Sequence, residues 1–261
     1  MADTAAAEAA SVTAFWQGLG LPGLVDVHTH FMPDNVLVKV WDFFDSGRAA
    51  VGQPWPIVYR RPERERVGLL RAFGVRTFSA LLYPHKPGMA AWLNSWAVDF
   101  AARTPDALHS ATFFAEPEAP GYVAEAGAPV IVHCGSGPTP GPHTGPGPMS
   151  QVLARHPGLT AIIAHLGAPE YGEFLALALR HPNVYLDTTM TFTDFMQRLA
   201  PFPAGLRPRL AAAAERILLG SDFPNIPYPY LHQLEALDRL GLGPDWLRAV
   251  CHGNATRLLG L

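Results

Sequence analysis

Short runs of apolar and β-branched residues alternate along the chain with longer amphipathic stretches of helical length. This alternation is typical of βαβ units, in which helices connect parallel strands. The short runs predict seven strands, over residues 24–28, 75–81, 108–114, 129–133, 159–165, 184–187 and 217–221. The amphipathic stretches predict helices over residues 62–73, 88–103, 148–155, 169–180, 192–200, 230–240 and 244–259. The pattern therefore indicates an α/β fold with a parallel sheet.

Two stretches follow predicted strands but contain no strand of their own. Residues 31–61 hold aromatic residues and prolines, and we expect an extended loop over the end of the sheet where the strands finish. Residues 135–148 (GSGPTPGPHTGPGP) have a composition that is also found in flexible linkers. A structured loop is favoured for them, because they directly follow a strand that ends in a histidine.

The composition fits one domain. The chain has 261 residues, of which 49% are hydrophobic and 16% charged, and its length is close to the roughly 250 residues of a (β/α)₈ barrel. We expect a single domain over residues 1–261, with residues 1–20 as an N-terminal extension. A formal net charge of -3 and a pI near 6.4 give no electrostatic reason to expect nucleic acid or an anionic membrane as a partner.

The cysteines, the N-terminal residues and the length of the apolar runs indicate where the protein is located. Cys134 and Cys251 are far apart in sequence and lack CxxC spacing, so neither a disulfide scaffold nor a cysteine zinc site is indicated. The first residues carry acids and no basic segment, unlike a signal peptide, and no apolar run has the roughly 20 residues that cross a bilayer. We expect a cytoplasmic protein with a small-molecule substrate, and the sequence leaves a homodimer open.

The first candidate for chemistry is the segment Asp26-Val27-His28-Thr29-His30. Alternate residues of a strand point to the same side, so both imidazoles lie on one face. Two imidazoles on one face make half of a metal site. The pair alone is a weak signal, because histidine is also a common polar residue at strand ends.

Further residues that can bind metals stand at the ends of later predicted strands. His133 ends one apolar run, His165 ends the next, and Asp222 follows the last. In a parallel barrel these strand ends converge on one rim. Four imidazoles and a carboxylate at one rim suit zinc or a similar divalent ion, and we favour this over a chance arrangement of buried histidines.

Five motifs, DVHTH, VHCGS, AHLGA, LLGSDFP and GNATRLLGL, occur in this order over nearly the whole chain. Together they resemble the amidohydrolase superfamily, and within it the amidohydrolase-related branch of aminocarboxymuconate-semialdehyde decarboxylase-like, metal-dependent hydrolases. The resemblance implies a TIM-type barrel in which His28, His30, His133 and Asp222 bind a divalent metal, with zinc as the expected ion. It also implies that His165 is a catalytic acid or base beside the metal, and that Asp222 has a catalytic role in addition to binding.

The number of metals follows from the lysines. Binuclear members of this superfamily bridge two metals with a carboxylated lysine on the fourth strand. Here Lys39 lies in the first long loop and Lys86 follows the second predicted strand, so neither can take that place. We therefore expect one metal ion per chain, and one Zn²⁺ can lower the pKa of a bound water to about 7.

One departure from the family pattern concerns the strand count. Residues 115–128 separate the third predicted strand from the strand that ends in His133, which leaves room for one helix and no further βα unit. We therefore predict seven strands in place of eight, with the fourth βα unit of the family missing. The predicted ligands are retained, but closure of the barrel depends on how residues 112–114 meet residues 130–132.

The sequence leaves three hypotheses for the activity. The first is hydrolysis of a small-molecule ester, lactone or amide by a metal-activated water, with Asp222 accepting the proton. The second is non-oxidative decarboxylation of a small aromatic or unsaturated acid, because the opening DVHTHFMP resembles the decarboxylase branch. The third is a non-catalytic remnant that binds a metal or a partner. Weaker candidates for substrate contact are His85, His143, Arg60 and Arg61, for which ordinary loop positions are the alternative.

Overall fold

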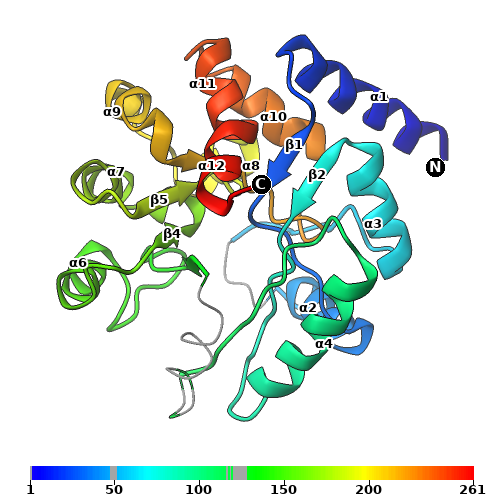
Figure 1. Ribbon diagram of the computed structural model, residues 1–261, viewed down its shortest axis with the longest axis horizontal. Helices are drawn as coiled ribbons and strands as arrows, with labels where there is room; N and C mark the ends of the chain where they lie inside the picture. Colours follow the sequence, from blue (N-terminus) through cyan, green and yellow to red (C-terminus); the bar gives the residue numbers. More distant parts are fainter. Residues whose placement is uncertain (1, 48–51, 116, 118, 120–127) are drawn as a thin grey trace.

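The computed structural model describes residues 2–47, 52–115, 117, 119 and 128–261. Its strands occupy the middle of the molecule and its helices surround them (Figure 1). The strands are β1 Leu24–Asp26, β2 Val75–Phe78, β3 Val130–Val132, β4 Ala161–Ile163, β5 Val184–Asp187 and β6 Ile217–Leu218. The main helices are α1 Ala2–Gly18, α2 Asp34–Asp45, α3 Glu63–Ala72, α4 Ala90–Arg103, α6 Pro146–Arg155, α7 Tyr171–Arg180, α8 Asp194–Leu199, α9 Arg207–Ala212, α10 Tyr230–Asp238, α11 Pro244–Arg248 and α12 Asn254–Leu259.

All strand pairings are parallel. The strands β3, β4, β5 and β6 pair in this order, and β1 pairs with β2. Backbone hydrogen bonds beyond β6 and β1 join the two sets, because Val27 N donates to Leu219 O and Asp222 N donates to His28 O, both at 2.9 Å. The described pairings therefore form one arc, β3-β4-β5-β6-β1-β2, which we call the paired arc.

The third predicted strand, over residues 108–114, is not formed as predicted. Only Ala107 pairs with Phe78 there, as an isolated bridge next to β2. Beyond it, side chains replace the ladder: Ala80 N donates to Ser110 Oγ at 3.0 Å and Thr112 N donates to Asn94 Oδ1 at 2.7 Å. Among the described residues no pairing joins this segment to β3. Most of the predicted connection, 115–128, lies outside the described residues.

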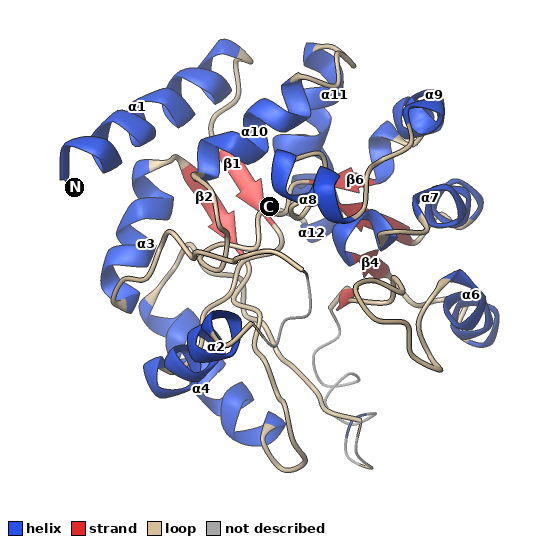
Figure 2. Ribbon diagram, turned by 180° about the vertical axis from the view of Figure 1, so that it is seen from behind, coloured by secondary structure: helices blue, strands red, loops and turns tan. Residues whose placement is uncertain are grey.

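The predicted helices are present with small shifts of their ends, and the described residues contain three more, α1, α2 and α9. The N-terminal extension is the helix α1, which packs against α3 and α10 (Figure 2). Trp16 Nε1 donates to Phe73 O at 3.0 Å and fastens α1 to the end of α3. The expected loop 31–61 contains α2, and α9 precedes β6. No helix among the described residues is long and apolar enough to cross a membrane.

One buried arginine holds the ends of the segment that carries α2. Arg66 is fully buried, Nε donates to Arg61 O at 2.9 Å, and Nη2 lies 3.3 Å from Asp34 Oδ1. Its guanidinium lies over the ring of Phe31, 5.1 Å from the centroid. These contacts hold together the two ends of the segment between Asp34 and Arg61, which begins shortly after the histidine pair.

Most of the core is apolar, but polar side chains are buried at the carboxyl ends of the strands. The group comprises Asp26, His28, Thr29, His30, Asp187, Thr188, Thr189, Ser221 and Asp222. Buried polar groups are costly unless they are hydrogen-bonded. Because so many buried polar side chains gather at one end of the sheet, this end is the candidate for a functional site.

Candidate metal centre

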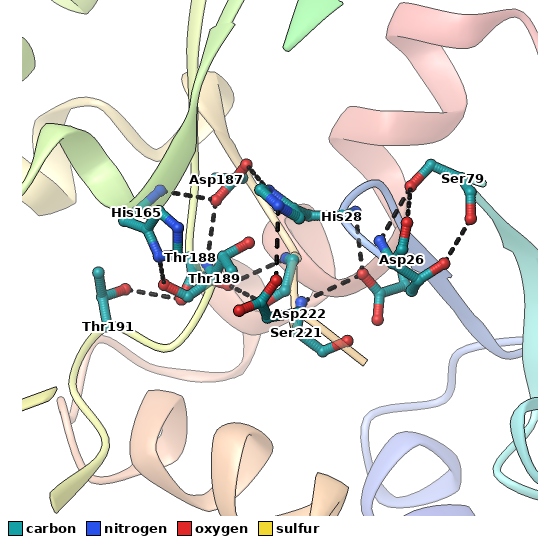
Figure 3. Close-up of polar contacts among 12 residues, drawn as sticks. Asp26, His28, Ser79, His165, Asp187, Thr188, Thr189, Thr191, Ser221 and Asp222 are labelled. Carbon is teal, nitrogen blue, oxygen red and sulfur yellow. Dashed lines mark hydrogen bonds and ion pairs between the residues drawn. The ribbon is translucent and has the colours of Figure 1, made fainter. Parts of the chain in front are cut away.

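The five residues predicted to form the site come from four strand ends. His28 and His30 follow β1, His133 follows β3, His165 lies in the short 3₁₀ turn after β4, and Asp222 follows β6. The ring centroids of His28 and His133 are 5.1 Å apart, and those of His133 and His165 are 5.0 Å apart. The structure therefore brings together side chains that lie up to almost 200 residues apart in the sequence. Figure 3 shows three of the five, His28, His165 and Asp222.

Two groups of three could hold a metal ion, and His28 belongs to both. The first is His28, His133 and His165, and the second is His28, His30 and Asp222; within each group the ligand atoms lie within 4.8 Å of one another. His133 is the exposed member and the second group is fully buried. The cluster is therefore buried on the side of β1 and β6 and accessible on the side of β3.

His28 is oriented by a buried carboxylate. Its Nδ1 lies 2.8 Å from Asp187 Oδ2. A carboxylate can only accept, so Nδ1 carries the proton and Nε2 is turned to the cluster, an arrangement common among metal-binding histidines. Burial lowers the pKa of His28, but the charge and the hydrogen bond of Asp187 outweigh it and the pKa is raised. His28 Nε2 is buried and has no hydrogen-bond partner among the described residues.

Several ligand-type atoms crowd around His30. Its Nε2 lies 2.8 Å from Asp222 Oδ1 and 2.9 Å from Tyr83 Oη, and the same Asp222 oxygen is 3.8 Å from His28 Nε2. Burial alone would raise the pKa of Asp222, but the hydrogen bond and charge of His30 lower it to about 2. An ionised carboxylate, a crowded imidazole nitrogen and the unpaired His28 Nε2 are a donor set that fits a divalent cation.

His165 is held with one ring nitrogen free. Its Nδ1 lies 3.0 Å from Thr189 O and its backbone N donates to Asp187 Oδ1 at 3.0 Å. Because a carbonyl can only accept, Nδ1 carries the proton and Nε2 keeps a lone pair. Burial lowers the pKa of His165, which favours the neutral ring. This placement permits either metal binding or proton transfer, and the predicted role as acid or base stays a prediction.

Two site residues have left-handed backbone. The φ angle is 54° at His165 and 73° at Asp222. Residues other than glycine rarely adopt this region, which costs about 1–3 kcal/mol each and is frequent at functional sites. The backbone N of Asp222, which donates to His28 O, helps to hold its conformation.

Asp26 connects the strand ends behind the cluster. Its Oδ1 accepts from His28 N at 3.1 Å and from Ser221 N at 3.2 Å, and its Oδ2 accepts from Tyr230 Oη at 2.9 Å. Burial raises the pKa of Asp26 to about 6, against the effect of these donors. The carboxylate therefore fixes the end of β1 relative to the segment that carries Asp222.

Three residues of the site, Asp187, Tyr83 and Asn225, were not predicted from the sequence. Asp187 ends a predicted strand, so the rule that identified His133 and His165 could have found it. Tyr83 follows β2 and Asn225 follows Asp222 by three residues, and no motif in the sequence marks either of them.

None of the contacts described for the cluster involves the four weaker candidates. His85 and His143 are exposed. Arg60 pairs with Asp45, with 2.7 Å between Nη1 and Oδ2, and lies over the ring of Trp41; Arg61 pairs with Glu65 at 3.2 Å. Substrate contact by these four residues stays a prediction. The Gly/Pro-rich loop after His133 has defined contacts, since Ser136 N donates to Glu170 Oε2 at 3.0 Å.

Gly220 allows three strands to approach closely at the site. A Cβ atom there would lie 2.2 Å from Thr189 Oγ1 and 2.8 Å from His28 Cβ. We expect Gly220→Ala to lower the free energy of unfolding by about 1–3 kcal/mol, the usual cost of overpacking, and to weaken metal retention by displacing His28. Denaturant unfolding and elemental analysis measure the two effects.

Gly68→Ala is the matched control. Gly68 is exposed inside α3, and its added Cβ would meet no atom within 4 Å. This variant should gain about 0.5–1 kcal/mol through helix propensity and keep its metal. Equal stability and metal content in the two alanine variants would contradict the close approach at Gly220.

Comparison by sequence gives a family match. A family model described as amidohydrolase matches residues 118–261, more than half of the chain. This range contains His133, His165 and Asp222. No curated protein matches the chain by sequence.

Comparison of the fold gives several solved structures. An uncharacterized TIM-barrel protein from Bordetella bronchiseptica is similar with a TM-score of 0.66 and 20% identity, over 91% of this chain and 99% of that one. A 2,6-dihydroxybenzoate decarboxylase in complex with 2,6-dihydroxybenzoate gives 0.59 and 15%, over 92% and 100%. A 5-carboxyvanillate decarboxylase from Novosphingobium aromaticivorans, in complex with manganese and a nitrobenzoic acid, gives 0.54 and 12%, over 93% and 97%. The fold is thus a TIM-type barrel.

Proposed function

The chain belongs to the amidohydrolase family, and from this membership together with the geometry of the cluster we propose that it is a metal-dependent hydrolase of a small-molecule ester, lactone or amide. The family and the similar folds indicate an enzyme of this superfamily. The observation that carries the proposal is the convergence of four imidazoles and Asp222 around the unpaired, buried His28 Nε2. Hydrolysis is the activity we assign first because it is typical of the superfamily as a whole.

Amidohydrolases generally use a divalent metal, and the donor set here fits one. We assign His28, His30, His133 and Asp222 as its ligands and zinc as its identity, since imidazole and carboxylate together suit that ion. When bound, such an ion supplies Lewis-acid chemistry, which acidifies water and polarises a carbonyl. A manganese ion accompanies one of the similar structures, so manganese is the alternative to test.

The residues of the chain supply the proton transfers and the orientation. Asp222 is ionised and can accept a proton at a carboxylate oxygen from a water molecule in the cluster. His165, neutral and held through Nδ1, can accept or return a proton at Nε2. Asp187 keeps His28 and the backbone of His165 in place with its two oxygens. The buried side of the cluster limits the access of other water molecules.

Non-oxidative decarboxylation of a small aromatic or unsaturated acid is the second candidate. It is favoured by the opening DVHTHFMP and by the names of two similar structures, both decarboxylases of aromatic acids. The same groups would serve it, with a proton delivered to the carbon from which carbon dioxide leaves. The two candidates therefore differ in substrate and not in the residues that bind the metal.

The metal content is the first measurement. We expect about one divalent ion per chain after purification without a chelator, because the two groups of candidate ligands share His28 and the chain has no lysine placed to bridge a second ion. Elemental analysis measures this. Two tightly held ions, or none, would contradict the assignment.

Turnover then tests the activity itself. The metal-loaded protein is assayed on panels of lactones, esters and amides for hydrolysis and of aromatic acids for release of carbon dioxide. Turnover in the first panel that a chelator abolishes supports hydrolysis. Turnover in the second panel alone replaces it by decarboxylation. A metal-loaded protein that is inactive in both panels would favour the non-catalytic remnant.

A further inference from the structure

Asn225 is a buried amide whose orientation is set by a tryptophan. Its side chain is fully buried, and Oδ1 accepts from Trp41 Nε1 at 3.1 Å. An indole N–H can only donate, so this bond assigns the oxygen and leaves Nδ2 as the donor. Nδ2 makes no hydrogen bond of ordinary length and angle to a described residue. A buried donor without a partner is costly, and such groups in native proteins often have a functional explanation.

The group next to this amide is the phenol of Tyr83. The Asn225 side chain acts on this phenol as a donor that lowers its pKa, although burial raises the pKa overall. Tyr83 Oη is 2.9 Å from His30 Nε2. The two rings of Tyr83 and His30 are stacked, with centroids 4.4 Å apart and planes at 23°. Trp41, Asn225 and Tyr83 therefore form a chain of contacts from α2 to a candidate metal ligand.

The position of Tyr83 Oη brings it within reach of the reacting groups. An ion held by His30 Nε2 would lie about 2 Å from that nitrogen, and Tyr83 Oη is 2.9 Å from the same atom. A substrate oxygen bound beside such an ion would come within reach of a hydrogen bond from the phenol. A phenol that donates in this way has its oxygen lone pairs free, and the Asn225 Nδ2–H can then donate to them.

We propose that Tyr83 is a further catalytic residue, which donates a hydrogen bond from Oη to a carboxylate oxygen of the substrate or product, and that Asn225 is a positioning residue for it. A carboxylate is the class that fits, because it only accepts hydrogen bonds and has one oxygen for the metal and one for the phenol. Both candidate reactions present such a group, as the product of hydrolysis or the substrate of decarboxylation. The inference rests on the proposed metal-dependent function of the same site.

The test uses benzoate as the probe and the metal-loaded full chain. Calorimetry measures the dissociation constant of benzoate, and elemental analysis measures the metal content of each variant. Tyr83→Phe removes one hydroxyl and should raise the dissociation constant about tenfold or more at unchanged metal content. Tyr185→Phe is the matched control, because that hydroxyl lies 3.2 Å from Arg216 Nη1, away from the cluster's contacts, and it should bind as the wild type does.

A double-mutant cycle tests the positioning role. Asn225→Leu keeps a similar volume without the donor and should weaken benzoate binding about threefold to tenfold. In the Tyr83→Phe background the same change should add almost nothing, since its effect passes through the phenol. Full additivity would overturn the role of Asn225, and unchanged binding in Tyr83→Phe would overturn the role of Tyr83.

The outcomes also separate this inference from the proposed function. A wild-type protein that holds one metal but does not bind benzoate overturns the carboxylate assignment and leaves metal-dependent turnover standing. A wild-type protein that holds no metal overturns both. Loss of metal in Tyr83→Phe would reassign the phenol to the support of His30 and overturn its contact with substrate.

Discussion

Replacing His165 by alanine should lower turnover by about 10²- to 10⁴-fold, the range that acid or base groups commonly supply, and leave the metal content nearly unchanged. The physical reason is the fixed ring, whose Nδ1 is occupied by Thr189 O at 3.0 Å and whose Nε2 is free for a proton. Elemental analysis and steady-state kinetics on the same preparation measure the two effects. The split between them separates proton transfer from metal binding.

His133→Ala is the variant with which His165→Ala is compared. The ligand atoms of His133 and His165 lie in the same group with that of His28, so distance alone treats the two residues alike. We expect His133→Ala to lose its metal. If His165→Ala loses metal as readily, His165 is a ligand and its assignment as acid or base is wrong.

Replacing Asp222 by alanine should abolish turnover and weaken metal retention together. Asp222 is buried, ionised, and within 2.8 Å of His30 Nε2, so it is assigned both as a ligand and as the acceptor of a proton from water. Its removal also leaves buried imidazoles without their counter-charge. Metal titration and kinetics measure the joint loss.

Asp194→Ala provides the matched control for Asp222→Ala. Asp194 is 73% exposed and lies 3.7 Å from His232 Nε2 and from Arg239 Nη2 in surface pairs. Exposed pairs contribute little, so this variant should keep its metal, its turnover and, within about 1 kcal/mol, its stability. An Asp222→Ala protein that retains both metal and turnover would remove the residue from the site.

Much of the fold could be predicted from the periodicity of the sequence. Buried strands such as Val184–Asp187 have continuous apolar runs, and the helices between them have amphipathic repeats, so both carry a local signal. The third predicted strand failed because its apolar residues give the same signal, while the hydrogen bonds to Ser110 and Asn94 that replace its ladder are tertiary contacts. The helix Ala2–Gly18 is rich in alanine, the residue with the highest helix propensity. This propensity could have predicted the helix, but the segment was considered only as a possible signal peptide.

The candidate site was predictable to the extent that its residues end strands. His133 and His165 follow apolar runs directly, and the convergence of parallel strands places them together. Asp187 obeys the same rule, although its effect on His28 depends on a contact across 159 residues of sequence. The role proposed for Tyr83 and Asn225 depends on the path of the long segment that carries Trp41, and no local pattern determines that path.

The paired arc has a consequence for how the barrel tolerates change. His133, His165, Asp187, Asp222 and His28 all follow or end strands that are neighbours along the arc, from β3 through β6 to β1. The predicted loss of a βα unit concerns the segment between Ala107 and β3, which lies outside the described pairings that connect these residues to one another. Changes in that segment therefore leave the pairings from β3 through β6 to β1 as they are. The relative positions of the candidate ligands thus depend on the paired arc and not on how that segment completes the barrel.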